Sequence, residues 1–134
     1  MRYPIFIEKD SDSDYGVTIP DLPGCFSSGI TLDEALSNAR EAILTHIEGM
    51  LMDDEVINTP SGIDVLKEKN ANSDYIWAVC EVDISKLSEV AKRVNVTFSE
   101  SVLSRIDGYA QAVGDTRSGF LADAALEYIS HHSR

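Results

Sequence analysis

Three side chains suited to contacting DNA bases alternate along one short segment of the chain. Residues 93–98 alternate polar and apolar side chains, which is the pattern of a β-strand with one buried face. The polar members are Arg93, Asn95 and Thr97, and the apolar members are Val94, Val96 and Phe98. Arginine pairs best with guanine, asparagine with adenine, and threonine can contact a thymine methyl group. An exposed ribbon made of two such strands would fit the major groove of DNA.

The elements that follow this strand explain why it needs a partner. A helical pattern begins at Ser99, a glycine stop falls at Gly114, and a second helical pattern follows. Residues 92–134 number only 43, which is too few to enclose a core alone. We therefore expect the strand to pair with its own copy in a second chain. The dimer core is then predicted to hold Val94, Val96, Phe98, Leu103, Ile106, Phe120 and Leu121.

A second group of candidate residues, all acidic, lies near the N-terminus. Glu8 is followed by Asp10, Asp12 and Asp14, which alternate along a turn. The spacing of the three aspartates is similar to that of a calcium-binding loop, but the required glycine and the distal glutamate are missing. We expect a solvated hairpin tip here, with no metal ion and no cofactor.

The length and composition indicate a globular protein. The 134 residues suffice for one ordinary domain or two small ones, and 43% of them are hydrophobic. No apolar run approaches the length of a membrane span, and the N-terminus lacks the pattern of a signal peptide, so we expect a cytoplasmic protein without a membrane partner. Cys25 and Cys80 lie within separate strand-like segments. We expect both to be reduced thiols in a core, because two sulfurs alone make no zinc site.

The net charge of −12 is unevenly distributed along the chain. Residues 1–91 hold 18 acidic and 6 basic side chains, whereas residues 92–134 hold 5 of each. Strong acidity normally argues against binding to nucleic acid, because phosphate contacts need cations. The uneven distribution weakens this objection, since a neutral module can bind DNA while an acidic module faces another partner.

The N-terminal part is predicted to be a small α+β layer. Strand patterns cover residues 3–9, 15–19, 25–29 and 75–82. The last of these strands is apolar enough to be central in the sheet. Thr31 and Glu34 form a capping box at the start of a helix that ends near Met52. A shorter helix is predicted between residues 60 and 69.

This N-terminal part resembles the HicB-type antitoxins. The resemblance rests on YGV at 15–17, IPDLPGCFSSG at 19–29, TLDEA at 31–35, NA at 38–39 and EAI at 41–43. It implies a truncated RNase H-like domain of β-β-β-α-β order over residues 1–84. It also implies a protein partner, a small HicA-type toxin that cleaves mRNA and is occluded by this domain.

The resemblance raises the question of whether the domain keeps nuclease chemistry. An RNase H enzyme needs several carboxylates that converge on metal ions. Glu8 or Asp10 could supply one, but no carboxylate falls at the matching ends of the long helix and the fourth strand. We expect no catalytic residue and no enzymatic activity. The acids Glu8, Asp10, Asp12 and Asp14 are instead candidates for contacting a basic surface of the toxin, where they would mimic phosphate.

Residues 92–130 resemble the ribbon-helix-helix repressors of the Arc, MetJ and CopG type, on the strength of the opening KRVNVTFSESVL. The resemblance implies a domain over 92–134, joined by a linker at 85–91, in which Arg93, Asn95 and Thr97 contact bases. It also implies phosphate contacts by Lys92 and by the start of the second helix, at Thr116, Arg117 and Ser118. The alternative is that the three ribbon residues are only the solvated face of a dimer strand and that Thr116 and Ser118 are ordinary caps.

Taken together, the two resemblances imply an antitoxin of a type II toxin-antitoxin system that neutralises a HicA-type toxin and represses its own operon. The C-terminal domains would form a homodimer on double-stranded operator DNA, and two dimers could join through the N-terminal domains. One alternative is a ligand-responsive ribbon-helix-helix repressor without a toxin partner. A minimal RNase H-like nuclease is the other alternative, and the missing carboxylates argue against it.

Overall fold

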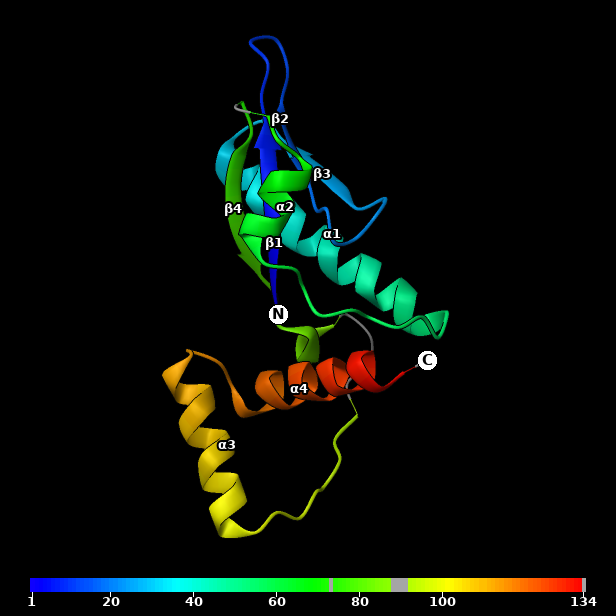
Figure 1. Ribbon diagram of the computed structural model, residues 1–134, viewed down its shortest axis with the longest axis vertical. Coiled ribbons are helices and arrows are strands. Elements are labelled where there is room, and N and C mark those ends of the chain that lie inside the picture. The colour runs from blue at the N-terminus through cyan, green and yellow to red at the C-terminus, as the bar shows by residue number, and fades with distance from the viewer. Residues whose placement is uncertain (73, 88–91, 134) are drawn as a thin grey trace. The chain divides into compact units, whose positions relative to one another are not determined.

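The computed structural model describes residues 1–72, 74–87 and 92–133, and it shows an α+β protein (Figure 1). The chain divides into two compact units. We call residues Met1–Val82 unit 1 and residues Asp83–Arg134 unit 2. The predicted linker at 85–91 begins beyond this division, and its residues 88–91 lie outside the described residues.

Unit 1 is built on a four-stranded antiparallel sheet in the order β3-β2-β1-β4. The strands are β1 (Arg2–Glu8), β2 (Tyr15–Thr18), β3 (Phe26–Gly29) and β4 (Ile76–Glu81). All four were predicted. The expectation that the last strand is central was wrong, because β4 pairs with β1 at one edge and β1 is an inner strand. The apolar side chains of β4 are explained by its contribution to both faces of the sheet.

The core of unit 1 lies between the sheet and the long helix α1 (Leu32–Met52). Alternate residues of β1, namely Tyr3, Ile5 and Ile7, are almost completely buried, as the period of a strand requires for one face. The helix presents residues at intervals of three and four to this face, and its buried members are Ala35, Ala39, Ile43 and Ile47. Apolar burial of this kind contributes roughly 25 cal/mol per Å² and is the main stabilising term of the unit.

The start of α1 is determined by local chemistry. The Thr31 hydroxyl accepts a hydrogen bond from the Glu34 amide at 3.1 Å, as the capping box predicted. Directly before it, Gly29 packs so closely on α1 that a Cβ atom there would collide with the backbone of Ala35. This contact places β3 against the N-terminal end of the helix.

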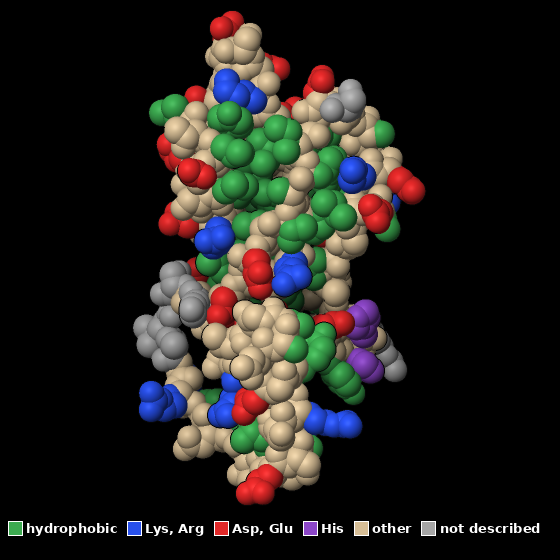
Figure 2. Space-filling model, turned by 90° about the vertical axis from the view of Figure 1, so that its left-hand side faces the viewer, with side chains coloured by type: hydrophobic (Ala, Val, Ile, Leu, Met, Phe, Trp, Pro, Cys, Tyr) green, Lys and Arg blue, Asp and Glu red, His purple; other side chains and the backbone are tan. Residues whose placement is uncertain are grey.

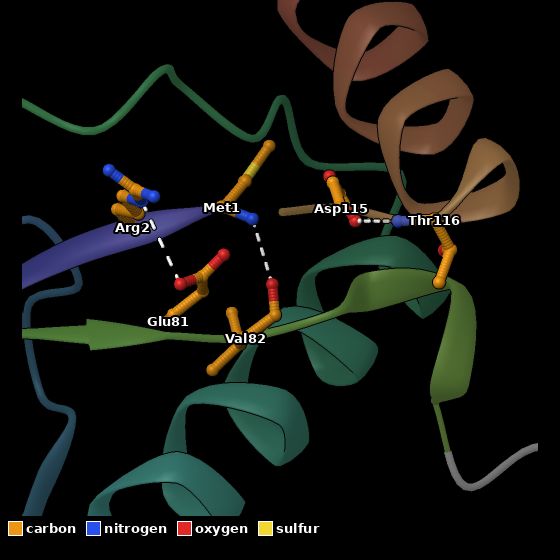
Figure 3. A network of polar contacts seen from close by, with 6 residues as sticks. All are labelled: Met1, Arg2, Glu81, Val82, Asp115 and Thr116. Carbon is orange, nitrogen blue, oxygen red and sulfur yellow. Dashed lines mark hydrogen bonds and ion pairs between the residues drawn. The ribbon is translucent and has the colours of Figure 1, made fainter. Parts of the chain in front are cut away.

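Three polar contacts complete unit 1. The short helix α2 (Ile63–Lys69) follows α1 and precedes β4 in the sequence. The segment before α2 is held by Asp21, whose carboxylate accepts hydrogen bonds from the Ser61 amide at 2.8 Å and from the Ser61 hydroxyl at 2.7 Å. At the end of the sheet, the Met1 ammonium donates to the Val82 carbonyl at 2.8 Å (Figure 3). Beside them, Arg2 and Glu81 form an exposed ion pair at 3.8 Å.

Unit 2 contains a short 3-10 helix, η1 (Ile84–Lys86), followed by α3 (Glu100–Ala112) and α4 (Arg117–His132). Ser99 caps α3 by accepting from the Val102 amide at 3.3 Å, and Gly114 follows the helix with a φ of +74°, as its predicted stop position requires. The rings of Tyr109 and Phe120 pack against each other with centroids 5.4 Å apart, and this contact joins α3 to α4. Among the described residues, no helix is long and apolar enough to cross a membrane.

Residues 92–98 differ from the sequence-based expectation in one respect. They form no regular secondary structure in the single chain, whereas a strand was predicted over residues 93–98. A strand is defined by hydrogen bonds to a neighbouring strand, and the segment finds no such neighbour within the described part of its own chain.

Candidate functional site

The main candidate site is a groove in unit 2 with a volume of about 1140 Å³. One side is formed by Lys92 and residues 94–98, and the other by the first turn of α4. Six of the seven predicted DNA-contacting residues therefore line a single groove, although Thr116 follows Thr97 by 19 positions in the sequence. The six are Lys92, Asn95, Thr97, Thr116, Arg117 and Ser118.

The seventh predicted residue, Arg93, is exposed but does not line the groove. Asn95 and Thr97 are exposed as well as lining it. The local backbone thus presents all three predicted base-contacting side chains to solvent. No neighbouring strand in the described part of the chain fixes a pleat for this segment.

Arg117 makes a contact that the sequence did not predict. Its guanidinium donates two parallel hydrogen bonds to the Asp107 carboxylate, at 2.8 Å from Nε and 2.7 Å from Nη2. These bonds lower the pKa of Asp107 and raise that of Arg117. The pair links α3 to the first turn of α4 and gives the guanidinium a defined position at the groove. No sequence pattern reveals this ion pair, because its two residues are ten positions apart and belong to two different helices.

The start of α4 is capped by Thr116. Its hydroxyl accepts from the Gly119 amide at 3.0 Å, and its own amide donates to the Asp115 carboxylate at 2.7 Å (Figure 3). Both Asp115 and Thr116 are of residue types that cap helices, and the structure assigns the cap to Thr116. Thr116 therefore has a structural role whether or not it also contacts phosphate.

The apolar residues of unit 2 are poorly covered in the single chain. Val94 and Val96 are 68% and 67% exposed, and the other residues of the predicted dimer core are partly buried, none of them completely. Further exposed apolar side chains lie on α3, at its C-cap and on α4, namely Val102, Tyr109, Val113, Tyr128 and Ile129. So many exposed large apolar side chains in a small unit favour an interaction site.

In unit 1 the predicted acidic residues lie at the β1–β2 hairpin. Glu8, Asp10 and Asp14 line a shallow depression of about 290 Å³ together with Thr18 and Phe26, whereas Asp12 is exposed at the tip outside it. The tip is held by backbone groups and the Ser13 hydroxyl, which accepts from the Asp10 amide at 3.0 Å. The carboxylates are thus presented on a well-defined turn.

The structure offers little support for metal chemistry or thiol chemistry. No group of three or more His, Cys, Asp or Glu residues that could hold a metal ion occurs in the described part of the chain. Cys25 and Cys80 are buried free thiols, and burial raises the pKa of each, which keeps them protonated and unreactive.

Comparison with known proteins gives a consistent result. Residues 3–125 match the family described as HicB-like antitoxin of bacterial toxin-antitoxin system. A 14.9 kDa protein of Haemophilus phage HP1, encoded in the rep-hol intergenic region and itself uncharacterised, is 43% identical over 131 residues, which are 96% of this chain and 98% of that protein.

Two solved structures of the antitoxin HicB from Burkholderia pseudomallei are also similar. The complete antitoxin is 43% identical with a TM-score of 0.77, over 96% of this chain and 98% of that one. Its N-terminal domain alone is 42% identical with a TM-score of 0.55, over 62% of this chain and 99% of that one. The predicted resemblance to HicB antitoxins and the predicted α+β fold class are confirmed, and the family is one of antitoxins, not of enzymes. The chain belongs to the HicB-like antitoxins of bacterial toxin-antitoxin systems.

Proposed function

We propose that this HicB antitoxin neutralises a HicA-type mRNA-cleaving toxin through unit 1 and represses its own operon through unit 2. The work divides between a toxin-binding domain at 1–84 and a DNA-binding domain at 92–134, joined by residues 85–91. Both partners, an mRNA-cleaving protein and operator DNA, place the protein in the cytoplasm.

Charge supports the assignment of the toxin to unit 1. This unit holds 16 acidic and 5 basic side chains, a net charge of −11. A protein that binds and cleaves mRNA must present cations to phosphates. Opposite charges on the two proteins accelerate their association and disfavour wrong partners. Glu8, Asp10, Asp12 and Asp14 are the proposed contacts at the hairpin.

The groove in unit 2 carries the proposal of DNA binding. It gathers six of the residues that the ribbon-helix-helix resemblance assigns to DNA, and Val94, Val96 and Phe98 line it among them. We propose that a second copy pairs with residues 93–98 and buries these apolar side chains. The pairing turns Arg93, Asn95 and Thr97 of both copies to one side of a two-stranded ribbon, which is the side that enters the major groove.

The electrostatics of unit 2 are compatible with this role. Residues 92–134, the proposed DNA-binding part of unit 2, carry equal numbers of acidic and basic side chains, so their net charge does not repel DNA. The acidic unit 1 adds an unfavourable background field, and affinity for DNA should therefore depend on close contacts and on low salt. Lys92, Thr116, Arg117 and Ser118 are the proposed phosphate contacts.

A gel-shift experiment with the DNA upstream of the protein's own gene tests this function. The wild-type protein is expected to bind at nanomolar to micromolar concentration, and Arg93→Ala should weaken specific binding by about tenfold or more, since one good base contact contributes about 1–3 kcal/mol. The matched control is Arg105→Ala, which removes the same charge from an exposed position on α3 outside the groove.

The controls separate the two halves of the proposal. Both arginine variants should neutralise the toxin as well as the wild type does, measured as rescue of growth when toxin and antitoxin are co-expressed. If Arg93→Ala and Arg105→Ala bind the operator equally well, the ribbon assignment is wrong. A wild-type protein that represses its operon but never binds the toxin would indicate the ligand-responsive repressor instead.

A further inference from the structure

The sheet of unit 1 has one face that α1 does not cover. Strand register identifies this face, because Phe26 pairs with Thr18, Thr18 with Phe6, and Phe6 with Trp77. These four side chains form one row across all four strands, on the face opposite Tyr3, Ile5 and Ile7. In the next row Pro4 pairs with Val79. We call the six residues of the two rows the open face.

The open face is apolar and only partly exposed, because Pro4 and Phe6 are buried and the short helix α2 contacts β4. Phe26 is 65% exposed and Val79 is 50% exposed, at opposite edges of the sheet. Between them Phe6 is buried beside two aromatic rings. The Tyr75 ring stacks on the Phe6 ring with centroids 4.2 Å apart, and the Trp77 ring packs against it with centroids 5.2 Å apart. Figure 2, viewed from the side on which β4 lies in Figure 1, shows hydrophobic side chains gathered into one area over unit 1 with acidic side chains at its margin.

The acidic hairpin borders this apolar surface. Glu8, Asp10 and Asp14 line the same depression as Thr18 and Phe26, which belong to the row across the sheet. At the other end of β1, the face is closed by the Arg2–Glu81 ion pair, whose charges compensate each other. Glu8, Asp10 and Asp14, which outnumber the one cation of the hairpin, Lys9, therefore lie at the hairpin end of the open face, next to Phe26.

We propose that the open face is the docking surface for the toxin, with Phe26, Trp77 and Val79 as apolar contacts and Glu8, Asp10 and Asp14 as contacts to its cations. The proposal rests on the toxin-binding function proposed above and adds the surface that carries it. An apolar centre beside a charged margin is the usual anatomy of a protein interface. The acids occupy the position in which they can pair with the basic side chains that the toxin uses to hold RNA.

Charge distinguishes the toxin from a second copy of this chain as the occupant. Two copies of unit 1 would bring together net charges of −11 each, with three carboxylates from each copy beside the contact. Like charges close to an interface oppose association, whereas a basic partner gains from the same arrangement. The open face is therefore suited to a cationic partner.

The test compares two valine-to-lysine variants of the full-length protein. Val79→Lys places a cation on the open face, and Val65→Lys places one on α2 at a residue that is also 50% exposed. The probe is the purified HicA-type toxin encoded in the same operon, with affinity measured by biolayer interferometry. We expect Val79→Lys to weaken binding by about tenfold or more, because a cation buried against a basic partner is unpaired. Val65→Lys should stay within about twofold of the wild type.

A second variant and a second measurement keep the test decisive. Phe26→Lys, at the opposite edge of the same face, should weaken toxin binding as Val79→Lys does, with thermal melting used to verify that each variant is folded. If the wild type binds the toxin and both open-face variants bind equally well, the docking surface is wrong while the toxin-binding function stands. If these variants instead change the oligomeric state measured by light scattering and leave toxin affinity intact, the face belongs to a second copy. A wild type that does not bind the toxin overturns the proposed function together with this inference.

Discussion

At the scale of single residues, Arg117 shows how a side chain acquires a role that its type alone does not determine. It was predicted to contact phosphate, and the structure pairs it with Asp107 through two hydrogen bonds. Two parallel bonds orient a guanidinium better than one, because its planar fork matches the carboxylate. Asp107 thus holds Arg117 at the groove, and an exposed pair of this kind contributes little to stability.

The geometry of this pair predicts a titration experiment. Arg117→Lys keeps the positive charge but cannot form the two parallel bonds, so the pKa of Asp107 should rise towards its ordinary value. The carboxyl titration measured by NMR gives the answer, with Arg105→Lys as the control that leaves Asp107 unchanged. An identical Asp107 titration in Arg117→Lys and the wild type would contradict the bidentate geometry.

The same pair has a defined effect on the pH dependence of stability. The folded protein has the lower pKa for Asp107, so its stabilising contribution is present above the pKa of the unfolded state. The contribution is lost as the pH falls through the folded pKa. Because the pair is exposed, wild type and Asp107→Asn should differ only slightly in melting temperature at neutral pH, and they should converge in acid.

At the scale of elements, the packing of β3 on α1 depends on the absence of a side chain at Gly29. A Cβ atom at this position would overlap the backbone of Ala35, which cannot move without shifting the start of the helix. The strand is tied to the same helix by Asn38, whose side-chain amide donates to the Ser28 carbonyl at 2.9 Å. The position of Phe26 on the open face depends on this docking of β3.

Two glycine substitutions test the packing against each other. Gly29→Ala should destabilise the protein by about 1–3 kcal/mol, because inserting an atom into a close contact forces the backbone apart. Gly49→Ala, at an exposed position inside α1 with nothing within 4 Å of the new atom, should stabilise it by about 0.5–1 kcal/mol. Urea denaturation followed by circular dichroism measures both. Equal effects of the two changes would contradict the described contact.

At the scale of the whole molecule, the two units differ in how far a single chain completes them. Unit 1 encloses a core between its sheet and α1, whereas the described part of unit 2 buries few of its large apolar side chains. The solved N-terminal domain of the Burkholderia pseudomallei antitoxin corresponds to unit 1 and was crystallised without the rest of its chain. Unit 2 is expected to depend on a second copy for its stability, so its melting should vary with protein concentration.

A charged residue on the proposed ribbon tests this dependence. Val96→Asp should dissociate the dimer and abolish operator binding, because two carboxylates would face each other in a buried interface. Sedimentation equilibrium measures the mass, and a gel shift measures the DNA binding. Toxin binding should remain, since unit 1 is unchanged, and Val65→Lys in unit 1 should leave the mass unchanged. A variant that stays dimeric would exclude residues 93–98 from the dimer interface.

The sequence by itself determined the elements of this protein and most of their ends. Strand alternation, helical periodicity and caps such as Thr31, Ser99 and Gly114 act between residues that are close in the chain, so they can be recognised without a structure. The same local patterns carried the family resemblance, because the motifs on which it rests lie at turns and caps and fall in contiguous segments. The acidic and neutral regions of the chain were likewise evident from composition alone.

Only the tertiary structure decided which distant residues meet. It placed β4 at the edge of the sheet and not at its centre, paired Arg117 with Asp107, and joined the acidic hairpin to the open face through Thr18 and Phe26. These outcomes depend on strand order and on the angle between helices, which are set by the burial of the whole core and leave no local pattern. Residues 93–98 differ from these cases. Their alternation of polar and apolar side chains is visible in the sequence, but a strand also needs a neighbour to hydrogen-bond with, and the described part of the chain supplies none.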